Sequence, residues 1–323
     1  MNGIARLIVR ILAISCLGAG ANLTTAAADS PTASTTSAEL HWVSDGFNNR
    51  DLTLSPAGDE LFTTLMSPKN VGAAILYARK TADGWTPLEV APFSGVWTDI
   101  EPMFAPDGQR LFFVSQRPKP DRPGSDWDIW FVERTEHGWS EPINPGAPVN
   151  TDGNEFYPSV TADGTLYFTA DRQEYGASED ILRSRWTRDG YLKVERVPGE
   201  ANTSTFEFNS FIAADESYLI FGSQRREGEM GGGDLYISYR RQDGSFGPGQ
   251  LLPAPVNSTR LDYCPFVHTN EQGESRLYFT SERLISHDRA SLTVTEIRSR
   301  FTGPGNGMGD IYSISTDILP KVP

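Results

Sequence analysis

One recurring phrase limits what this chain can fold into more than any other feature. Asp99–Arg117 shows it in full: an acidic residue, an extended segment, a Pro-Asp-Gly turn, an aliphatic and aromatic run, then Ser-x-Arg. Five copies follow one another at steps of 50, 56, 52 and 55 residues, measured between the turn residues Ala57, Asp107, Asp163, Asp215 and Asn270. Self-similarity at this period is typical of β-propeller blades, each of which is a four-stranded antiparallel sheet.

Each copy predicts the same order of strands. A short segment such as Glu155–Val160 leads into the Asp-Gly turn, which reverses the chain because Asp and Gly tolerate positive φ. An apolar second strand, a polar loop and a third strand that begins with Asp follow. The last copy stops after its third strand, whereas Leu40–Ser44 precedes the first copy and matches the end of an outer strand. The sequence therefore predicts an all-β propeller of five four-stranded antiparallel blades, with six as the alternative, closed by this N-terminal strand.

The first 28 residues predict a secretory signal peptide. Arg6 and Arg10 precede the apolar run Ile11–Ala21, which is too short to span a bilayer, and small residues follow up to Ala28. We expect cleavage after Ala28, export to the periplasm or the medium, a flexible leader over 29–39 and the propeller over 40–319. Lipoprotein anchoring at Cys16 is the less favoured alternative, because Arg10 leaves few apolar residues before it.

The net charge excludes some classes of binding partner, and the cysteine content excludes an internal disulfide. The chain has 28 Lys and Arg against 42 Asp and Glu, a formal net charge of −14 at pH 7. Such a chain is repelled by phosphate backbones and anionic lipid, so we expect no nucleic-acid partner, and no stretch after the signal peptide predicts a membrane span. Cys264 alone remains after cleavage and is expected to be buried without a disulfide.

The repeated phrase also resembles a known family. The run of an acidic residue, Pro-Ser, Asp-Gly, Leu-Tyr-Phe, Arg and then Asp-Ile-Trp or Asp-Leu-Tyr is similar to the WD40-like PD40 repeat of TolB-type periplasmic propellers. The resemblance covers nearly all of Leu40–Ser315 and implies an exported propeller used as a binding platform, without one shared activity. TolB itself carries an α/β domain before its propeller, and Ser30–Glu39 leaves no room for one, so we do not expect a role in the Tol system.

Acidic residues recur at the start of the first strand of each blade. Eight residues before the turn residues stand Asn49, Asp99, Glu155, Glu207 and Asp262, and two residues further on stand Asp51, Glu101, Tyr157, Asn209 and Cys264. The period of two places both sets on one strand face, which we expect to line a channel mouth. Carboxylates there would repel one another unless arginines, raised pKa values or a cation compensated, and calcium is the natural cation at Asp99, Glu155, Glu207 and Asp262. The alternative interpretation is that each acid caps its strand or pairs with a neighbouring blade's backbone.

Arginine and aspartate recur where the second strands end and the third strands begin. The arginines are Arg117, Arg172, Arg225 and Arg283, and the aspartates are Asp128, Asp180, Asp234 and Asp310. Both sets lie at the same edge of a blade, which predicts structural ion pairs between them. The loops at this edge, of which Leu284–Gly309 is the longest, are where binding residues are expected.

Motif searches assign no catalytic residue. The chain has no Gly-x-Ser-x-Gly, no His-Glu-x-x-His and no cysteine pair for zinc. We therefore expect a non-catalytic module that binds an envelope protein or a glycan on its loop-rich face. The alternative is a carbohydrate-active enzyme, a glycoside hydrolase or lyase, that uses channel carboxylates such as Asp99, Glu155 and Glu207. That alternative rests on the fact that other five-bladed propellers cleave sugars.

Overall fold

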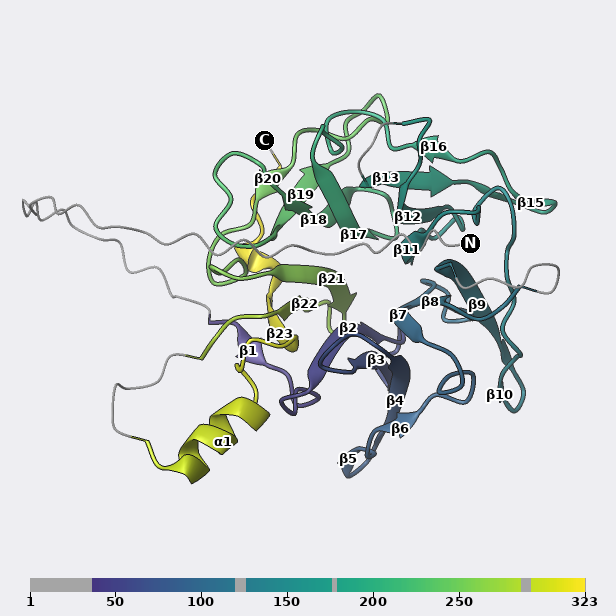
Figure 1. Ribbon diagram of the computed structural model, residues 1–323. Helices are drawn as coiled ribbons and strands as arrows, with labels where there is room; N and C mark the ends of the chain where they lie inside the picture. The colour runs from purple at the N-terminus through teal and green to yellow at the C-terminus, as the bar shows by residue number, and fades with distance from the viewer. Residues whose placement is uncertain (1–36, 120–125, 176–178, 286–291, 323) are drawn as a thin grey trace, which may run out of the picture. The chain divides into compact units, whose positions relative to one another are not determined.

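Five antiparallel sheets follow one another along the chain in a computed structural model that describes residues 37–119, 126–175, 179–285 and 292–322. The predicted signal peptide, its cleavage site, Cys16 and most of the predicted leader lie outside the described residues. The innermost strands of the five sheets are β2 (Asn48–Leu54), β7 (Asp99–Phe104), β11 (Glu155–Val160), β17 (Phe206–Ile212) and β21 (Asp262–Thr269). Each of these strands contacts the next and β21 contacts β2, so the five strands form a closed ring, whose labels surround the centre in Figure 1.

The strands outside this ring follow in chain order within each blade. The first blade continues with β3 (Glu60–Met66), β4 (Ala73–Thr81), β5 (Gly84–Trp85) and β6 (Glu89–Val90). The second continues with β8 (Arg110–Ser115), β9 (Asp128–Thr135) and β10 (Gly138–Trp139). The third has β12 (Leu166–Asp171), β13 (Glu179–Ser184) and β16 (Glu195–Arg196), with a side hairpin of β14 (Trp186–Thr187) and β15 (Gly190–Tyr191). The fourth has β18 (Tyr218–Gln224), β19 (Asp234–Tyr239) and β20 (Gln250–Leu251).

The fifth blade takes its outermost strand from the N-terminal end of the described chain. Beyond β21 come β22 (Ser275–Ser281), β23 (Asp310–Ser315) and then β1 (Glu39–Leu40), in that order. Glu39 lies opposite Ser313 and Leu40 opposite Tyr312, and the N–H of His41 donates to the carbonyl of Ile311 at 2.8 Å. The predicted fold, a five-bladed propeller closed by an N-terminal strand, is therefore confirmed, although this strand is two residues long and begins one residue earlier than expected.

Helical structure is confined to the fifth blade and the C-terminal end within the described ranges. Helix α1 (Val294–Thr302) lies between β22 and β23, and the 3-10 turn η1 (Thr316–Ile318) follows β23. Helix α1 begins with a capping box in which Thr293 and Glu296 satisfy each other's backbone N–H groups. None of the helices in the described part of the chain has the length and apolar character that a membrane crossing requires.

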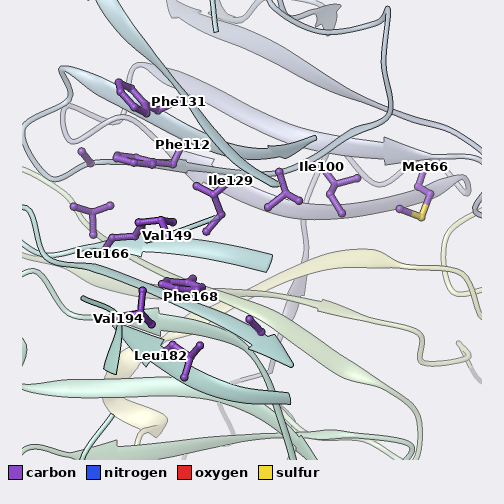
Figure 2. Close-up of a cluster of buried hydrophobic side chains, with 14 residues drawn as sticks. Met66, Ile100, Phe112, Ile129, Phe131, Val149, Leu166, Phe168, Leu182 and Val194 are labelled. Atoms are coloured by element: carbon purple, nitrogen blue, oxygen red, sulfur yellow. The ribbon is translucent and has the colours of Figure 1, made fainter. Parts of the chain in front are cut away.

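The apolar core lies between neighbouring blades. Phe112 and Phe113 are adjacent on β8 and point to opposite sheet faces, yet both are fully buried, because each sheet is covered on two sides by its neighbours. Figure 2 shows one such layer, where Phe112 and Phe131 of the second blade stand above Phe168 of the third. Burial on both faces explains why the second strands are continuous apolar runs.

A β-bulge interrupts every innermost strand at the same place. In all five, the pairing register with the second strand shifts over two residues, the first of which has a positive φ: Asp51 at 58°, Glu101 at 59°, Tyr157 at 50°, Asn209 at 46° and Cys264 at 52°. Proline follows in three of the blades, at a position where no ladder hydrogen bond is lost. Side chains before the bulge alternate between the two strand faces, but the bulge interrupts this alternation. The bulge therefore determines which side chains reach the centre.

Candidate functional site

The acidic residues at the strand starts do not line the channel. Asp99 is fully buried and binds Arg117 Nη2 at 2.8 Å, Ser115 Oγ at 2.6 Å and Ser94 Oγ at 2.8 Å. Arg117 also donates to the carbonyl of Phe93, which belongs to the segment that leaves the first blade. The carboxylate and the arginine together therefore join one blade to the next, a structural role of the kind that the alternative interpretation expected, although the arginine and not the acid binds the backbone of the neighbouring blade.

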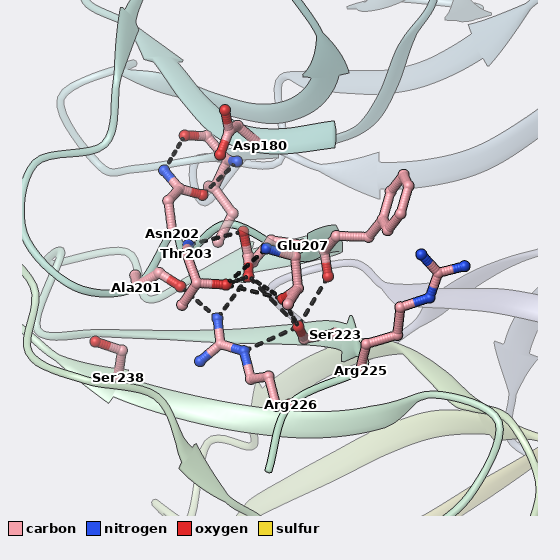
Figure 3. Close-up of polar contacts among 12 residues, drawn as sticks. Asp180, Ala201, Asn202, Thr203, Glu207, Ser223, Arg225, Arg226 and Ser238 are labelled. Carbon is pink, nitrogen blue, oxygen red and sulfur yellow. Dashed lines mark hydrogen bonds and ion pairs between the residues drawn. The ribbon is translucent and has the colours of Figure 1, made fainter. Parts of the chain in front are cut away.

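The same arrangement recurs in three further blades, and we call each one a blade latch. A latch consists of the first-strand carboxylate and an arginine that also donates to a carbonyl preceding that strand. The other pairs are Glu155 with Arg172 at 3.1 Å, Glu207 with Arg226 at 2.7 Å and Asp262 with Arg283 at 3.0 Å. Figure 3 shows the latch of the fourth blade, with Arg226 reaching Glu207, Ser223 and Ala201.

The latches correct the predicted pairing. Arg117, Arg172 and Arg283 bind first-strand carboxylates, because they turn back over their own first strands, and the latch arginine of the fourth blade is Arg226 rather than Arg225. The third-strand aspartates have other partners. Asp128 pairs with Lys119 at 2.9 Å, Asp180 with Arg196 at 2.7 Å, while Asp234 and Asp310 accept the N–H groups of Met230 at 2.5 Å and Gly305 at 2.6 Å.

The first blade has no latch. Asn49 takes the place of the carboxylate and donates to Asp45 Oδ1 at 2.7 Å, while its N–H donates to the carbonyl of Gly309 at 2.8 Å. Met66 takes the place of the arginine and is buried in the core shared with the second blade. Asn49 is therefore part of the junction between the first and fifth blades and not of a channel mouth.

This geometry also corrects the expected calcium site and the expected catalytic set. Among the residues that the structure describes, no three His, Cys, Asp or Glu side chains lie close enough together to hold a metal ion. Asp99, Glu155, Glu207 and Asp262 belong to four different blades, and each is 0% exposed and bound by its own arginine. Each of these carboxylates therefore belongs to a junction between blades and not to a shared site at the propeller axis.

The side chains that do converge are those of the bulged residues. Asn209 Nδ2 of the fourth blade donates to Glu101 Oε1 of the second blade at 3.2 Å, and Tyr157 Oη of the third donates to the Pro265 carbonyl of the fifth at 2.9 Å. The Tyr157 N–H donates to Glu101 Oε2 at 2.6 Å. Contacts between non-adjacent blades are possible only at the propeller axis, so these residues form an axial cluster, which we define as Arg50, Asp51, Glu101, Tyr157, Asn209 and Cys264.

Arg50 connects the carboxylates of the axial cluster. Its Nε lies 2.8 Å from Asp51 Oδ2, its Nη2 lies 3.0 Å from Glu101 Oε1, and its guanidinium stands over the Tyr263 ring at 5.1 Å. The arginine side chain is 16% exposed, against 1% and 3% for the two carboxylates. Arg50 precedes the bulge and so lies nearer the face from which the innermost strands begin, which we call the loop face.

Burial sets the protonation of the axial cluster. Desolvation raises the pKa of Glu101 to about 8 and the nearby Asp51 carboxylate adds to the rise, against the opposing effect of Arg50. Burial also raises the pKa of Cys264 well above its usual value, so this thiol stays protonated. A protonated Glu101 lowers the number of charges buried in the cluster, which a desolvated site favours. A protonated Glu101 is then a proton donor beside the Asp51 carboxyl group, with Arg50 in contact with both.

Sequence reasoning placed Glu101 at the channel but missed what separates it from the latch acids. The residues at the strand starts and those two positions further on were expected on one strand face. Because of the bulge, Asp99 instead lies at the junction between two blades and Glu101 faces the axis. Proline as the fourth residue of the innermost strand was the available signal, since proline inside a strand marks a bulge or an edge. Arg50 carried no signal, because the other blades have an apolar or aromatic residue at that position.

Comparison with known proteins shows the same architecture without a sequence relationship. No family model and no curated protein matches this chain. A solved structure described as a glycoside hydrolase has a TM-score of 0.55 at 9% identity, covering 88% of this chain and 92% of that one. A thermostable family-43 glycoside hydrolase gives 0.54 at 12% identity, covering 85% and 91%. The GH43_1 enzyme from Xanthomonas citri complexed with xylotriose gives 0.51 at 12% identity, covering 88% and 93%.

These similarities correct the expected function. At such low identity they show the fold alone, but the similar propellers are glycoside hydrolases and not binding proteins of the TolB type. The expectation of a non-catalytic binding module is therefore wrong, and the carbohydrate-active enzyme that stood as its alternative is the better supported of the two.

Proposed function

We propose that the protein is a carbohydrate-active enzyme that cleaves glycosidic bonds at the axial cluster, with Glu101 and Asp51 as its catalytic pair. The observation that carries the proposal is the meeting of these two carboxyl groups at the axis, bridged by Arg50, with the pKa of Glu101 raised to about 8. Glycoside hydrolysis needs one protonated and one ionised carboxyl group on either side of the bond, and different environments keep the two forms apart.

The two residues have separate roles in this proposal. Glu101 donates its proton to the glycosidic oxygen as the sugar leaves, and Asp51, held by Arg50 at 2.8 Å, either activates a water molecule or attacks the sugar directly. Arg50 covers both carboxylates from the loop face, so a substrate contacts Arg50 first and takes over part of its hydrogen bonding. Phe156 and Phe208, which hold the position of Arg50 in their strands and are partly exposed, offer ring faces to the sugar.

The similar structures support this choice by analogy of fold. They are glycoside hydrolases, one of which was solved with xylotriose, so oligosaccharides of pentoses are the first substrates to test. We also propose that the protein is exported, because its sequence predicts a signal peptide and polymeric glycans are found outside the cytoplasm. The expected partner is then a glycan bound on the loop face. We keep the relation of the repeats to the PD40 type as a proposal about their sequence ancestry.

The test measures hydrolysis and folding in the same variants. Purified protein is assayed on arabino- and xylo-oligosaccharides together with Asp51→Asn and Glu101→Gln, each of which should lower kcat at least about 100-fold, the usual contribution of acid-base catalysis. Glu155→Gln is the matched control, because its carboxylate belongs to a latch: it should lower the melting temperature and leave the kcat of the folded fraction unchanged. Rates that Asp51→Asn and Glu101→Gln leave intact would contradict the assignment.

A further inference from the structure

The end of β18 contains one residue more than the same place in the other blades. In the second and fifth blades a single residue separates the latch serine from the latch arginine, as in Ser115-Gln116-Arg117. In the fourth blade two residues, Gln224 and Arg225, separate Ser223 from Arg226, yet Arg226 Nε still reaches Ser223 Oγ at 2.9 Å. The latch is complete without Arg225, which is therefore an additional arginine with no part in joining the blades.

The backbone holds Arg225 in an unfavourable conformation. Its φ is 64°, a region that non-glycine residues occupy at a cost. The residue is fixed on both sides: its N–H donates to Glu229 Oε2 at 2.5 Å, and Gln224 Nε2 donates to the carbonyl of Gly232 at 2.9 Å. These contacts hold the backbone of Arg225, and with it the direction in which its side chain leaves the chain.

The Arg225 side chain has an aromatic support and no ion pair. Its guanidinium lies over the ring of Phe206 at 5.4 Å from the centroid, and the side chain is exposed. Within the described ranges no carboxylate comes within ion-pair distance of it, whereas Arg226 next to it is paired with Glu207. Figure 3 shows the two arginines diverging, with Arg226 turned into the latch and Arg225 away from it.

Phe206 and Arg225 lie on the loop face beside the axial cluster. Phe206 is the first residue of β17, and Asn209 on the same strand contacts Glu101. At about 3.3 Å per residue, the three steps from Phe206 to Asn209 span roughly 10 Å along the strand. A short oligosaccharide bound with one bond at Glu101 is long enough to cover this distance.

We propose that Arg225, supported by Phe206, binds the carboxylate of a uronic acid residue in the glycan that the axial cluster cleaves. This inference rests on the proposed function and adds the substrate class. A guanidinium and a carboxylate form a bidentate pair with two hydrogen bonds, and the Phe206 ring beneath the Arg225 guanidinium supports the guanidinium plane. An acidic protein repels an anionic glycan at long range, so recognition of such a substrate needs an unpaired cation at the site itself.

The experiment compares two substrates and four variants. A neutral xylo-oligosaccharide and the same oligosaccharide carrying a glucuronic acid branch are assayed with wild-type protein, Arg225→Gln, Arg225→Lys and Phe206→Leu. Arg188→Gln is the control, since Arg188 is exposed in the turn between β14 and β15 and its loss changes the net charge equally. Arg225→Gln should lower the ratio of kcat/KM for the acidic over the neutral substrate at least about 10-fold, Arg225→Lys should lower it less, and Arg188→Gln should leave it unchanged. An equal loss on both substrates, or the same shift in Arg188→Gln, would overturn the proposal.

A binding measurement separates this inference from the enzymatic one. Glucuronate and the acidic oligosaccharide are titrated into wild-type protein and Arg225→Gln, with the change in amide resonances as readout. If neither substrate is cleaved but the wild type binds glucuronate more tightly than Arg225→Gln, the proposed function fails and the subsite stands. If cleavage occurs and the two proteins bind the acid equally, the subsite fails and the proposed function stands.

Discussion

Asp51 and Glu101 reach the axis because each stands on a bulged residue with positive φ, two places along the strand from a latch position. The strain of that conformation is accepted in five strands alike, so it is a property of the repeat and not of one chemistry. What differs from blade to blade is the side chain placed there. The chemistry of the cluster therefore depends on single residues, whereas its geometry depends on the repeated backbone.

Protonation of Glu101 should make stability depend on pH. The pKa of Glu101 is raised from 4.5 to about 8, so the folded state holds this proton more tightly than the unfolded chain. The resulting stabilisation is fully present below pH 4.5 and is lost as pH rises through 8. Glu101→Gln cannot ionise, so its melting temperature should fall less than that of wild type between pH 5 and pH 9. The melting temperatures of wild type, Glu101→Gln and the exposed control Glu274→Gln are measured over this range. If the melting temperatures of wild type and Glu101→Gln change equally with pH, Glu101 is not protonated at neutral pH.

At single positions the sequence predicted less than it did for the strands. It identified the acidic residues by their recurrence but could not tell which of them faced the axis, because one inserted residue reverses the alternation of a strand. The same limitation misassigned Arg225: the spacing Ser-x-Arg selected it, and the extra residue in the fourth blade passes the role to Arg226. An equal spacing of residues in the sequence therefore does not show where an extra residue makes a strand bulge.

Within a blade, the latch buries an ion pair at the junction with the preceding blade. Each latch arginine lies over at least one aromatic ring of its own blade, as Arg117 lies over Phe113 and Trp130 at 4.8 and 5.3 Å from the ring centroids. The aromatic residues of the second and third strands therefore have two tasks, filling the core and holding the arginine plane. The sequence predicted these strands and their hairpin turns well, because each turn and each apolar run is a local signal.

Removal of a latch arginine should cost far more than removal of a surface one. Arg117→Ala leaves the fully buried Asp99 without its charged partner, a loss of about 3–5 kcal/mol in the free energy of unfolding. Arg79→Ala is the control, since Arg79 is 58% exposed and lies 3.7 Å from Glu60, and it should cost roughly 0–1 kcal/mol. Denaturant unfolding of both variants gives the comparison. Equal losses would mean that the latch adds no more than a surface ion pair.

The molecule as a whole is a ring that is closed where the short strand β1 pairs with β23. Strand β1 covers the outer edge of β23, and Ala38 packs against the core of the fifth blade. The repeat period predicted the number of blades and this closure, because each missing strand at one end had a counterpart at the other. It could not predict the axial cluster, since contacts across the ring join residues up to 214 positions apart and follow no local pattern.

Loss of β1 should weaken the whole ring. A chain that starts at Trp42 lacks the pairing of Glu39 and Leu40 with β23 and therefore exposes the edge of β23. A chain that starts at Ser37 retains this pairing, and the edge stays covered. We expect the shorter chain to melt several degrees lower and to aggregate on heating, as measured by calorimetry and light scattering. If the two chains melt at the same temperature, β1 does not contribute to closure.

The repeated bulge has a consequence for how such a protein can change. Five backbone positions of equal conformation point at one volume from five directions, and the latches that hold them use other residues. A substitution at a bulged position therefore alters the reactive groups while leaving the joints between blades intact. The aspartate, glutamate, tyrosine, asparagine and cysteine found there are one of many combinations that the same ring could carry, so a change in the chemistry of the axis requires exchanges of side chains and no rearrangement of the chain.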